Sequence, residues 1–407
     1  MQTQFANAVT QKENGTRLGG SILRAGGLVA FPTETVYGLG ANGLDGDAVR
    51  RIFEAKGRPG DNPLILHVAK KNDVKQLWTR IPDAARTLMD AFWPGPLTLI
   101  FNRSSAVPDE VTAGLETVAV RMPDNKTALA LIREAGVPVA APSANTSGKP
   151  SPTMAEHVRH DMEGKIDLII DGGPCRFGVE STVLSLVGKP TILRPGAVTK
   201  EMLEAVAGPV ALAPSILTPL KAGETAASPG MKYRHYAPKA PVTVITGAPE
   251  KSAQEILRRV GPTSGVICFE EFVDLFREQE VHTLGPVGDK LVQAQRVFDA
   301  LRTFDTSDVT EIFAQCPDNR GLGLAIGNRL KKAAGFHVVE ADSERVVLGL
   351  TGGTGAGKSS ALRAIRSLGG EVIDCDALYH EMLETCAPLR DEIGVSFPGA
   401  FDAAGQL

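Results

Sequence analysis

Residues 29–68 read VAFPTETVYGLGANGLDGDAVRRIFEAKGRPGDNPLILHV, and this stretch decides the fold expected for the first half of the chain. Apolar runs at 28–31 and 63–68 have the composition of buried strands, and a helical segment begins between them, after Asp45. Hydroxyl groups follow the first strand, the pair Lys56-x-Arg58 ends the helix, and His67 lies in the second strand. Because ligands of open α/β sheets bind at strand ends, we expect a polar site here.

Two features of this stretch have ordinary explanations. Residues 38–43 match the dinucleotide-binding pattern G-x-G-x-x-G, but the helix begins only after Asp45, so these glycines do not open it. We therefore interpret Gly38, Gly40 and Gly43 as turn residues. The Lys56–Arg58 pair alone is also typical of a helix C-terminus, where cations stabilise the dipole, so its meaning depends on partners elsewhere in the chain.

Length and composition limit the classes of protein to consider. A chain of 407 residues is too long for one hydrophobic core, and 43% hydrophobic with 22% charged residues is typical of globular proteins. A net charge of -4 gives no overall attraction to nucleic acid or anionic membranes. The N-terminus lacks the apolar segment of a signal peptide, and no apolar run approaches the ~18 residues of a membrane helix. Five scattered cysteines without a C-x-x-C pair favour the cytoplasm and argue against a zinc site.

The hydrophobic pattern predicts two α/β regions. Alternating apolar runs and helical segments in residues 1–205 indicate a mixed sheet, and a second α/β pattern begins at 241. Residues 206–240 between them are rich in Ala, Pro, Gly and Ser, as in linkers. The glycine-rich segment 321–327 precedes a basic helix, and we assign it no ligand. The strands are expected at 27–31, 64–68, 97–101, 118–121, 137–141, 168–170, 182–186, 191–194, 242–245 and 266–269, and the helices at 84–91, 126–135, 153–160, 252–260 and 289–303.

Small polar residues recur beside the predicted strand ends, at 143–147 and 178–182. Taken singly, Ser, Asn and Gly at such places are turn residues. Together with the cations Lys56, Arg58 and Arg121, and a fourth at Arg194, they favour a polyphosphate and a small zwitterion as ligands over a hydrophobic one.

Several separated motifs resemble the threonylcarbamoyl-AMP synthase family in its long two-domain form. The resemblance spans nearly all of residues 1–340 and implies an α/β fold: a twisted mixed-sheet catalytic domain at 1–205, a linker and lid at 206–240, and a Rossmann-like accessory domain at 241–342. The shared motifs are PTETVYGL (32–39), KGR (56–58) with NPL (62–64), SAN (143–145), GVEST (178–182) and SPGMKYRHYAP (228–238).

The resemblance also implies an activity. The family makes threonylcarbamoyl-AMP and pyrophosphate from L-threonine, bicarbonate and ATP, with Mg²⁺ accompanying the ATP. The product then passes to the tRNA threonylcarbamoyl transferase machinery; direct binding of tRNA by the chain itself is possible but not required, and no membrane is involved. Carried over by motif, the catalytic residues are Lys56, Arg58, Ser143 and Asn145, the threonine-binding residues are Thr35, His67, Arg121, Ala141 and Ser181, and the ATP-binding residues are Arg58, Asn62, Thr117, Ser143, Ser151, Arg194 and Tyr236. No metal ligands are evident.

The segment 232–236 (KYRHY) places two aromatic and three basic or titratable residues together. By resemblance it folds over the nucleotide as a lid that would exclude water from a labile product. The alternative is an ordinary solvated charge run.

Residues 343–407 carry a second phosphate-binding signal. An apolar strand at 346–350, the motif GGTGAGKS at 352–359 and a helix at 360–368 form a P-loop in its required setting, with Gly352, Gly357, Lys358 and Ser359 in the motif. A strand at 372–373 then leads to Asp376, the candidate base. This segment resembles the start of dephospho-CoA kinase. Only 62 residues remain from 346 to 407, against the ~100–200 of a typical domain, so we expect a truncated segment without kinase activity.

Two other classes of protein compete with the synthase. A module that binds RNA without catalysis would need a basic surface, but not the threonine-site residues, and the net charge is negative. A nucleotide kinase acting through the P-loop would need the acceptor pocket that is missing. The sequence therefore favours adenylate transfer to N-carboxythreonine.

Overall fold

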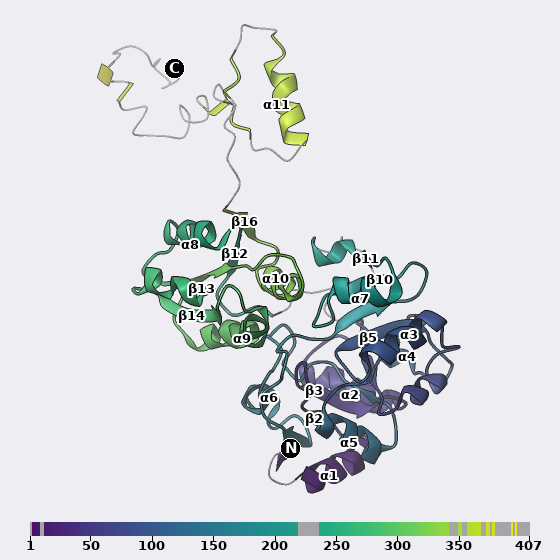
Figure 1. Cartoon of the computed structure of the whole chain (residues 1–407). Coiled ribbons are helices and arrows are strands. Elements are labelled where there is room, and N and C mark those ends of the chain that lie inside the picture. The colour runs from purple at the N-terminus through teal and green to yellow at the C-terminus, as the bar shows by residue number, and fades with distance from the viewer. Residues whose placement is uncertain are drawn as a thin grey trace, which may run out of the picture. The chain divides into compact units, whose positions relative to one another are not determined.

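The computed structural model describes residues 2–8, 12–218 and 236–341, together with 349–351, 356–367, 372–374, 377–378, 392–393 and 395–396. The chain divides into two compact units, Met1–Ser343 and Glu344–Leu407. Within the first unit, residues 2–218 form a first lobe and residues 241–341 a second lobe, each built around its own sheet (Figure 1).

The first lobe is built on an eleven-stranded mixed sheet with the order β1-β8-β2-β3-β7-β4-β6-β5-β9-β10-β11. This confirms the mixed α/β class predicted for the region. The strands are β1 (Gln4–Asn7), β2 (Val29–Phe31), β3 (Gly38–Asn42), β4 (Ile65–His67), β5 (Leu97–Asn102), β6 (Thr117–Arg121), β7 (Val139–Ala140), β8 (Leu168–Asp171), β9 (Thr182–Ser185), β10 (Thr191–Arg194) and β11 (Ala211–Leu212). The helices are α1 (Lys12–Arg24), α2 (Gly46–Lys56), α3 (Asp83–Phe92), α4 (Asp109–Thr112), α5 (Lys126–Ala135), α6 (Ala155–Met162) and α7 (Lys200–Ala207), with 3₁₀ turns η1 (Lys71–Gln76) and η2 (Pro214–Ile216).

The strand register gathers polar side chains at one end of this sheet. Strands β4 and β6 run parallel, with His67 opposite Arg121, so both strands end at the same level. Strand β5 runs antiparallel to β6 and places Thr98 opposite Arg121. Strand β9 begins beside the start of β5, with Thr182 opposite Leu97. Residues distant in sequence therefore meet at this end of the sheet.

The prediction that Gly38 and Gly40 are turn residues is wrong, because both lie in strand β3. They are small because β3 packs closely against its neighbours. A Cβ atom at Gly40 would lie 2.9 Å from both Phe31 and Val139. Gly43, which follows the strand, does lie in a turn.

The predicted linker begins too early. Residues 206–218 are not a plain connection, because α7 continues to Ala207 and the short strand β11 pairs in parallel with β10. A strand of two residues has too little periodicity to be recognised in a sequence. Residues 219–235 of the predicted linker and lid lie outside the part of the chain that the structure describes, whereas residues 236–240 are described.

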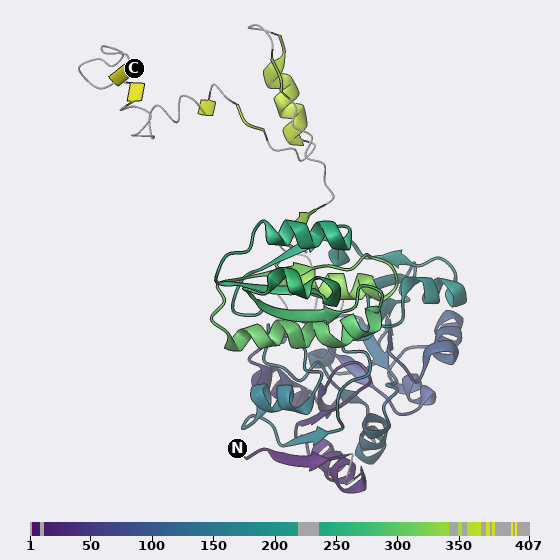
Figure 2. The ribbon, with the colours of Figure 1, turned by 60° about the vertical axis from the view of Figure 1, so that its left-hand side comes forward.

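The second lobe is a five-stranded sheet of order β14-β13-β15-β12-β16 in which every pair is parallel. Helices cover both faces of this sheet, as expected for a Rossmann-like domain (Figure 2). The last three strands were not predicted. The strands are β12 (Val242–Thr246), β13 (Ser264–Phe269), β14 (Glu280–Gly285), β15 (Glu311–Gln315) and β16 (Val338–Glu340), and the helices are α8 (Pro249–Leu257), α9 (Lys290–Thr303) and α10 (Leu322–Ala333), with 3₁₀ turns η3 (Glu270–Phe276) and η4 (Phe304–Thr306).

The glycine-rich segment 321–327 was predicted to precede a basic helix, but residues 322–327 form the first half of α10 and Gly321 is its N-cap. Close packing again explains Gly323 and Gly327. A Cβ at Gly323 would lie 1.9 Å from the carbonyl oxygen of Asp318, and one at Gly327 would lie 3.1 Å from the sulfur of Cys316.

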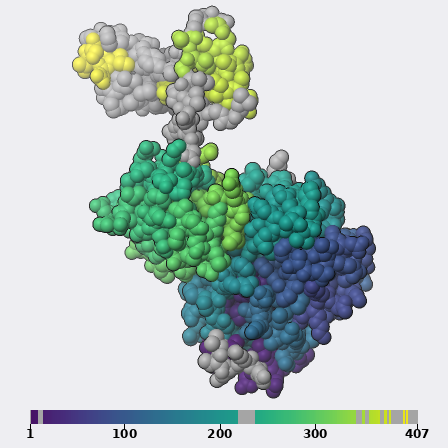
Figure 3. Space-filling view, in the orientation of Figure 1, coloured from purple at the N-terminus to yellow at the C-terminus, as the bar shows by residue number. Residues whose placement is uncertain are grey.

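The two lobes are in direct contact. Gly178 has a φ of 73°, and a Cβ there would lie 2.4 Å from the Cα of Gln295 in α9. Val36 and Val179 of the first lobe belong to the same buried apolar cluster as Phe298 of the second. The space-filling view shows light-green residues of the second lobe packed against teal residues of the first (Figure 3).

The C-terminal unit is described only in part. Helix α11 (Lys358–Ser367) confirms the helix predicted after the P-loop, although it begins two residues earlier. Residues 372–374 carry no strand, in contrast to the strand predicted at 372–373. The predicted P-loop residue Gly352 and the candidate base Asp376 lie outside the described residues. No helix in the described segments is long and apolar enough to cross a membrane.

Candidate active site

A pocket opens at the end of the first lobe's sheet where these polar residues gather. Its empty volume, the opening to solvent included, is about 740 Å³. The lining is rich in cations and hydroxyl groups. It consists of Thr33, Thr35, Val36, Gly38, Lys56, Arg58, Ile65, His67, Arg121, Ala141, Pro142, Ser143, Asn145, Ser147, Gly148, Lys149, Glu180, Ser181, Arg194 and Tyr236.

Three predicted ATP-binding residues do not line the pocket. The carbonyl oxygen of Asn62 accepts a hydrogen bond from the Arg58 guanidinium at 3.2 Å, and Ser151 is buried behind the wall. Thr117 is the first residue of β6, whereas Arg121 is its last, so the two are about 13 Å apart along the strand. All the other residues predicted for the synthase site are among the lining residues.

Arg121 is a cation held rigidly at the wall of the pocket. Only 3% of its surface is exposed. Its Nη1 donates to the Thr35 hydroxyl at 3.0 Å, and its Nε donates to the Gly95 carbonyl at 3.3 Å. Its Nη2 lies 2.7 Å from a carboxylate oxygen of Glu34, although the two are not aligned as a hydrogen bond. A fixed guanidinium of this kind suits a carboxylate ligand.

His67 is a neutral imidazole. Its Nδ1 lies 3.2 Å from the carbonyl oxygen of Ile65. Burial and the nearby positive charge of Arg121 lower the pKa of His67 to about 3. At neutral pH the ring is therefore a hydrogen-bonding group and not a cation.

Lys56 shapes the pocket as well as lining it. It is the last residue of α2, which ends at Gly57 in the left-handed conformation with a φ of 62°. Its Nζ donates to the carbonyl oxygens of Ser143 and Asn145 at 2.6 and 2.5 Å. Burial, with a smaller effect of Arg58, lowers its pKa well below the ordinary value. Two of the three N–H donors of its ammonium therefore hold the loop after β7. The sequence did not predict this role of Lys56.

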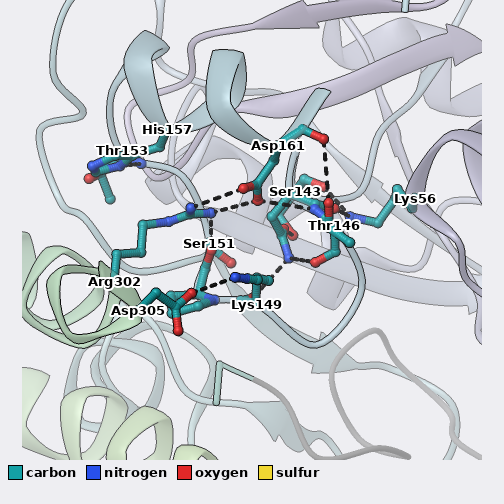
Figure 4. A network of polar contacts seen from close by, with 12 residues as sticks. Lys56, Ser143, Thr146, Lys149, Ser151, Thr153, His157, Asp161, Arg302 and Asp305 are labelled. Carbon is teal, nitrogen blue, oxygen red and sulfur yellow. Dashed lines mark hydrogen bonds and ion pairs between the residues drawn. The ribbon is translucent and has the colours of Figure 1, made fainter. Parts of the chain in front are cut away.

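That loop, residues 143–151, is held from the opposite side by the second lobe (Figure 4). Asp161 in α6 accepts from the backbone N–H of Thr146 at 3.1 Å and pairs with Arg302 at 3.0 Å. Lys149 pairs with Asp305 at 2.6 Å. The loop is thus fixed between α2 and the second lobe.

A second anchored cation lies at the end of β10. Arg194 donates to the carbonyl and to the hydroxyl of Ser181, both at 3.1 Å. The Ser181 hydroxyl is also 2.8 Å from that of Thr98. Burial lowers the pKa of Arg194 to about 10, so it stays charged at neutral pH.

The pocket is rich in basic side chains. Five lining residues are basic (Lys56, Arg58, Arg121, Lys149 and Arg194), and among the described lining residues only Glu180 is acidic. Arg121 and Lys149 face the carboxylates of Glu34 and Asp305, which do not line the pocket. Lys149 lies outside the shared motifs, and Glu180 lies within GVEST (178–182) but was assigned no role, because a motif does not show which of its side chains face the pocket. No cluster of three or more metal-binding side chains occurs in the described part of the chain.

A mixed α/β fold with a cationic pocket at its strand ends is typical of a nucleotide-binding enzyme. Comparison with known proteins agrees and is more specific. The family described as "Telomere recombination" matches residues 21–196, and the family described as "Threonylcarbamoyl-AMP synthase, C-terminal domain" matches residues 198–335. The chain belongs to the threonylcarbamoyl-AMP synthase family and is a transferase that acts on ATP.

Two relatives match over most of their length. The chain is 51% identical to the threonylcarbamoyl-AMP synthase of Bacillus subtilis over 323 residues, which are 78% of this chain and 92% of that protein. It is 48% identical to the synthase of Pyrococcus abyssi, over 80% of this chain and 95% of that one.

A solved structure is similar over the same region. The crystal structure of Sua5 from P. abyssi complexed with L-threonine has a TM-score of 0.77 and 45% identity. The match covers 84% of this chain and 99% of that one. The C-terminal residues 346–407 match the family described as "Dephospho-CoA kinase".

Proposed function

We propose that the chain forms threonylcarbamoyl-AMP and pyrophosphate from L-threonine, bicarbonate and ATP. The observation that carries this proposal is the pocket itself, in which two anchored arginines, Arg121 and Arg194, lie in one cationic cavity. The cavity offers one fixed guanidinium to a carboxylate and further cations to phosphates.

Threonine would bind at the Arg121 side of the pocket. The related structure from P. abyssi holds L-threonine, which supports an amino acid as ligand. Here Arg121 would pair with the carboxylate of threonine, while His67 and Ser181 supply neutral polar contacts to the rest of the amino acid. The apolar side chains of Val36 and Ile65 also line the cavity and suit a methyl group.

ATP would bind at the side formed by Arg58, Ser143 and Arg194. Mg²⁺ would arrive with the ATP, held mainly by phosphate oxygens and water, because hard cations prefer oxygen ligands. Lys149 also lines the pocket, although its ammonium pairs with Asp305.

The reaction needs positioning and charge neutralisation more than a nucleophilic side chain. The threonine amine joins the carbon of bicarbonate with loss of water, which gives N-carboxythreonine. A carbamate oxygen then bonds to the α-phosphorus as the bond to the β-phosphate oxygen breaks, and pyrophosphate leaves. Bringing two anions together is costly in water, so Arg58, Arg121 and Arg194 lower the barrier by holding and neutralising them. The product would serve tRNA threonylcarbamoylation.

Labelled bicarbonate tests the chemical proposal. The chain is incubated with ATP, Mg²⁺, threonine and ¹⁴C-bicarbonate, and the nucleotides are separated by chromatography. We expect the label in a new nucleotide that contains threonine. If the label stays in bicarbonate while the protein is folded, the proposal is wrong.

We further propose that residues 344–407 do not act as a kinase in this chain. The match to dephospho-CoA kinase covers residues 346–407, and these 62 residues are few for a kinase body that must also hold an acceptor.

A further inference from the structure

A side chain of the second lobe reaches the wall of the pocket. Arg329, in helix α10, is fully buried with 0% of its surface exposed. Its Nε donates to Glu180 Oε2 at 2.8 Å, and its Nη1 donates to the carbonyl oxygen of Pro195 at 2.9 Å. Both acceptors belong to the first lobe, so Arg329 crosses the boundary between the lobes.

Each acceptor is tied to a residue of the proposed nucleotide site. The other oxygen of Glu180 accepts from the hydroxyl of Ser151 at 2.6 Å. Pro195 directly follows Arg194, whose guanidinium lines the pocket. One arginine therefore fixes both the carboxylate that holds Ser151 and the backbone beside Arg194.

Electrostatics explains why this position needs a cation. Burial opposes ionisation of Glu180, but Arg329, Arg194 and the Ser151 hydrogen bond outweigh it and lower the pKa of Glu180 to about 2. Without Arg329, the negative charge of Glu180 would be less fully balanced by positive charge, and it would face the ATP phosphates. A buried charge that loses its partner is strongly unfavourable, and this one would also repel the ligand.

The packing around the contact is independent support. The Arg329 guanidinium lies 5.9 Å from the ring of Tyr236, which lines the pocket and packs against Phe298 of α9 with ring centroids 5.0 Å apart. Next to Arg329, Asn328 donates to the carbonyl oxygen of Ile216 at 2.9 Å. Helix α10 is thus docked firmly enough to position a side chain.

We propose that Arg329 is a positioning residue for ATP, through which the second lobe completes the nucleotide side of the pocket. This inference rests on the proposed function. Arg329 does not line the pocket and acts through Glu180 and the Pro195 carbonyl. Its loss should therefore affect ATP and leave threonine, held at Arg121, almost unaffected.

The test compares Arg329→Met with Asp299→Asn in the full chain. Asp299 pairs with His157 across the same lobe boundary at 3.3 Å, but neither residue lines the pocket. We expect Arg329→Met to raise the KM for ATP at least about tenfold while the Kd of threonine, measured by calorimetry without ATP, stays within about twofold. Asp299→Asn should leave both constants within about twofold.

A double variant separates positioning from general damage. Arg329→Met combined with Glu180→Gln removes the uncompensated carboxylate. The KM of this double variant for ATP should therefore be at least about threefold lower than that of Arg329→Met alone. If Arg329→Met is poorly folded by circular dichroism, Arg329→Lys replaces it. Lysine keeps the charge but cannot reach Glu180 and Pro195 together, so it should raise the KM at least about threefold.

Three results would overturn the inference: an unchanged KM for ATP in a folded Arg329 variant, an equal loss of threonine and ATP affinity, or no recovery in the double variant. If instead the wild-type chain binds neither ATP nor threonine, the proposed function itself fails. The two failures are therefore distinguishable.

Discussion

At the scale of single residues, Arg121 sets the geometry of the threonine side. Three contacts orient its guanidinium, with Gly95, Thr35 and Glu34. In Arg121→Lys the charge that faces Glu34 remains, but a lysine cannot form the paired hydrogen bonds of a guanidinium to a carboxylate. We expect threonine to bind at least about tenfold more weakly, or about 1.4 kcal/mol, by calorimetry. An unchanged threonine affinity in the folded variant would place the amino acid elsewhere.

The buried neutral His67 predicts a pH dependence of stability. Its pKa is about 3 in the folded protein, against about 6.5 in the unfolded chain. Between these values the unfolded state binds the extra proton, so stability is full above pH 6.5 and falls as the pH is lowered. The slope from this residue approaches about 1.4 kcal/mol per pH unit.

Urea titrations between pH 6.5 and 5, above the range in which most carboxylates titrate, would measure this slope. His67→Gln should unfold with a shallower pH dependence than the wild type. Identical slopes for the two proteins would mean that His67 is protonated in the folded state.

Sequence motifs identified most of the pocket at this scale, because a motif records residue types at fixed spacing. They could not show what each side chain does. Lys56 was expected to serve the phosphates, yet its Nζ donates to two carbonyl oxygens of the loop at 143–151. Arg329 belongs to no motif noted in the sequence, and its partner Glu180 is 149 residues away.

At the scale of elements, the loop at Gly178 joins the lobes. Its φ of 73° is close to the 72° of Gly188, but a Cβ at Gly188 would meet nothing within 4 Å, whereas one at Gly178 would strike α9. We expect Gly188→Ala to cost about 1 kcal/mol through backbone strain. Gly178→Ala should cost a further ~1–3 kcal/mol through overpacking and should raise the KM for ATP.

Urea unfolding of both glycine variants, with ATP kinetics alongside, checks this prediction. Equal destabilisation by the two substitutions would show that the lobe boundary at Gly178 is loosely packed.

Strong periodicity decided which elements could be predicted. The amphipathic helix α5 was predicted with its observed bounds, and strand β10 likewise. Strand β3 was missed because its glycines imitate a turn, and β11 because two residues carry no pattern. The pairing of β4 with β6, which brings His67 and Arg121 together, is a long-range contact that local sequence does not encode.

At the scale of the whole molecule, the pocket residues all lie between 33 and 236. We therefore expect a chain that ends at Ala341 to retain threonine-dependent pyrophosphate release with kcat and KM within about twofold of the 407-residue chain. The 407-residue chain should form no CoA from dephospho-CoA and ATP. CoA formation that disappears in Lys358→Ala would contradict the second expectation.

The most direct measurement of the central proposal is pyrophosphate release from ATP by the 407-residue chain, with threonine and bicarbonate omitted in turn. Release that requires both is the predicted result, because the carbamate that attacks the α-phosphorus contains atoms from each. Release that continues without threonine, or no release from a folded protein supplied with every substrate, would contradict it.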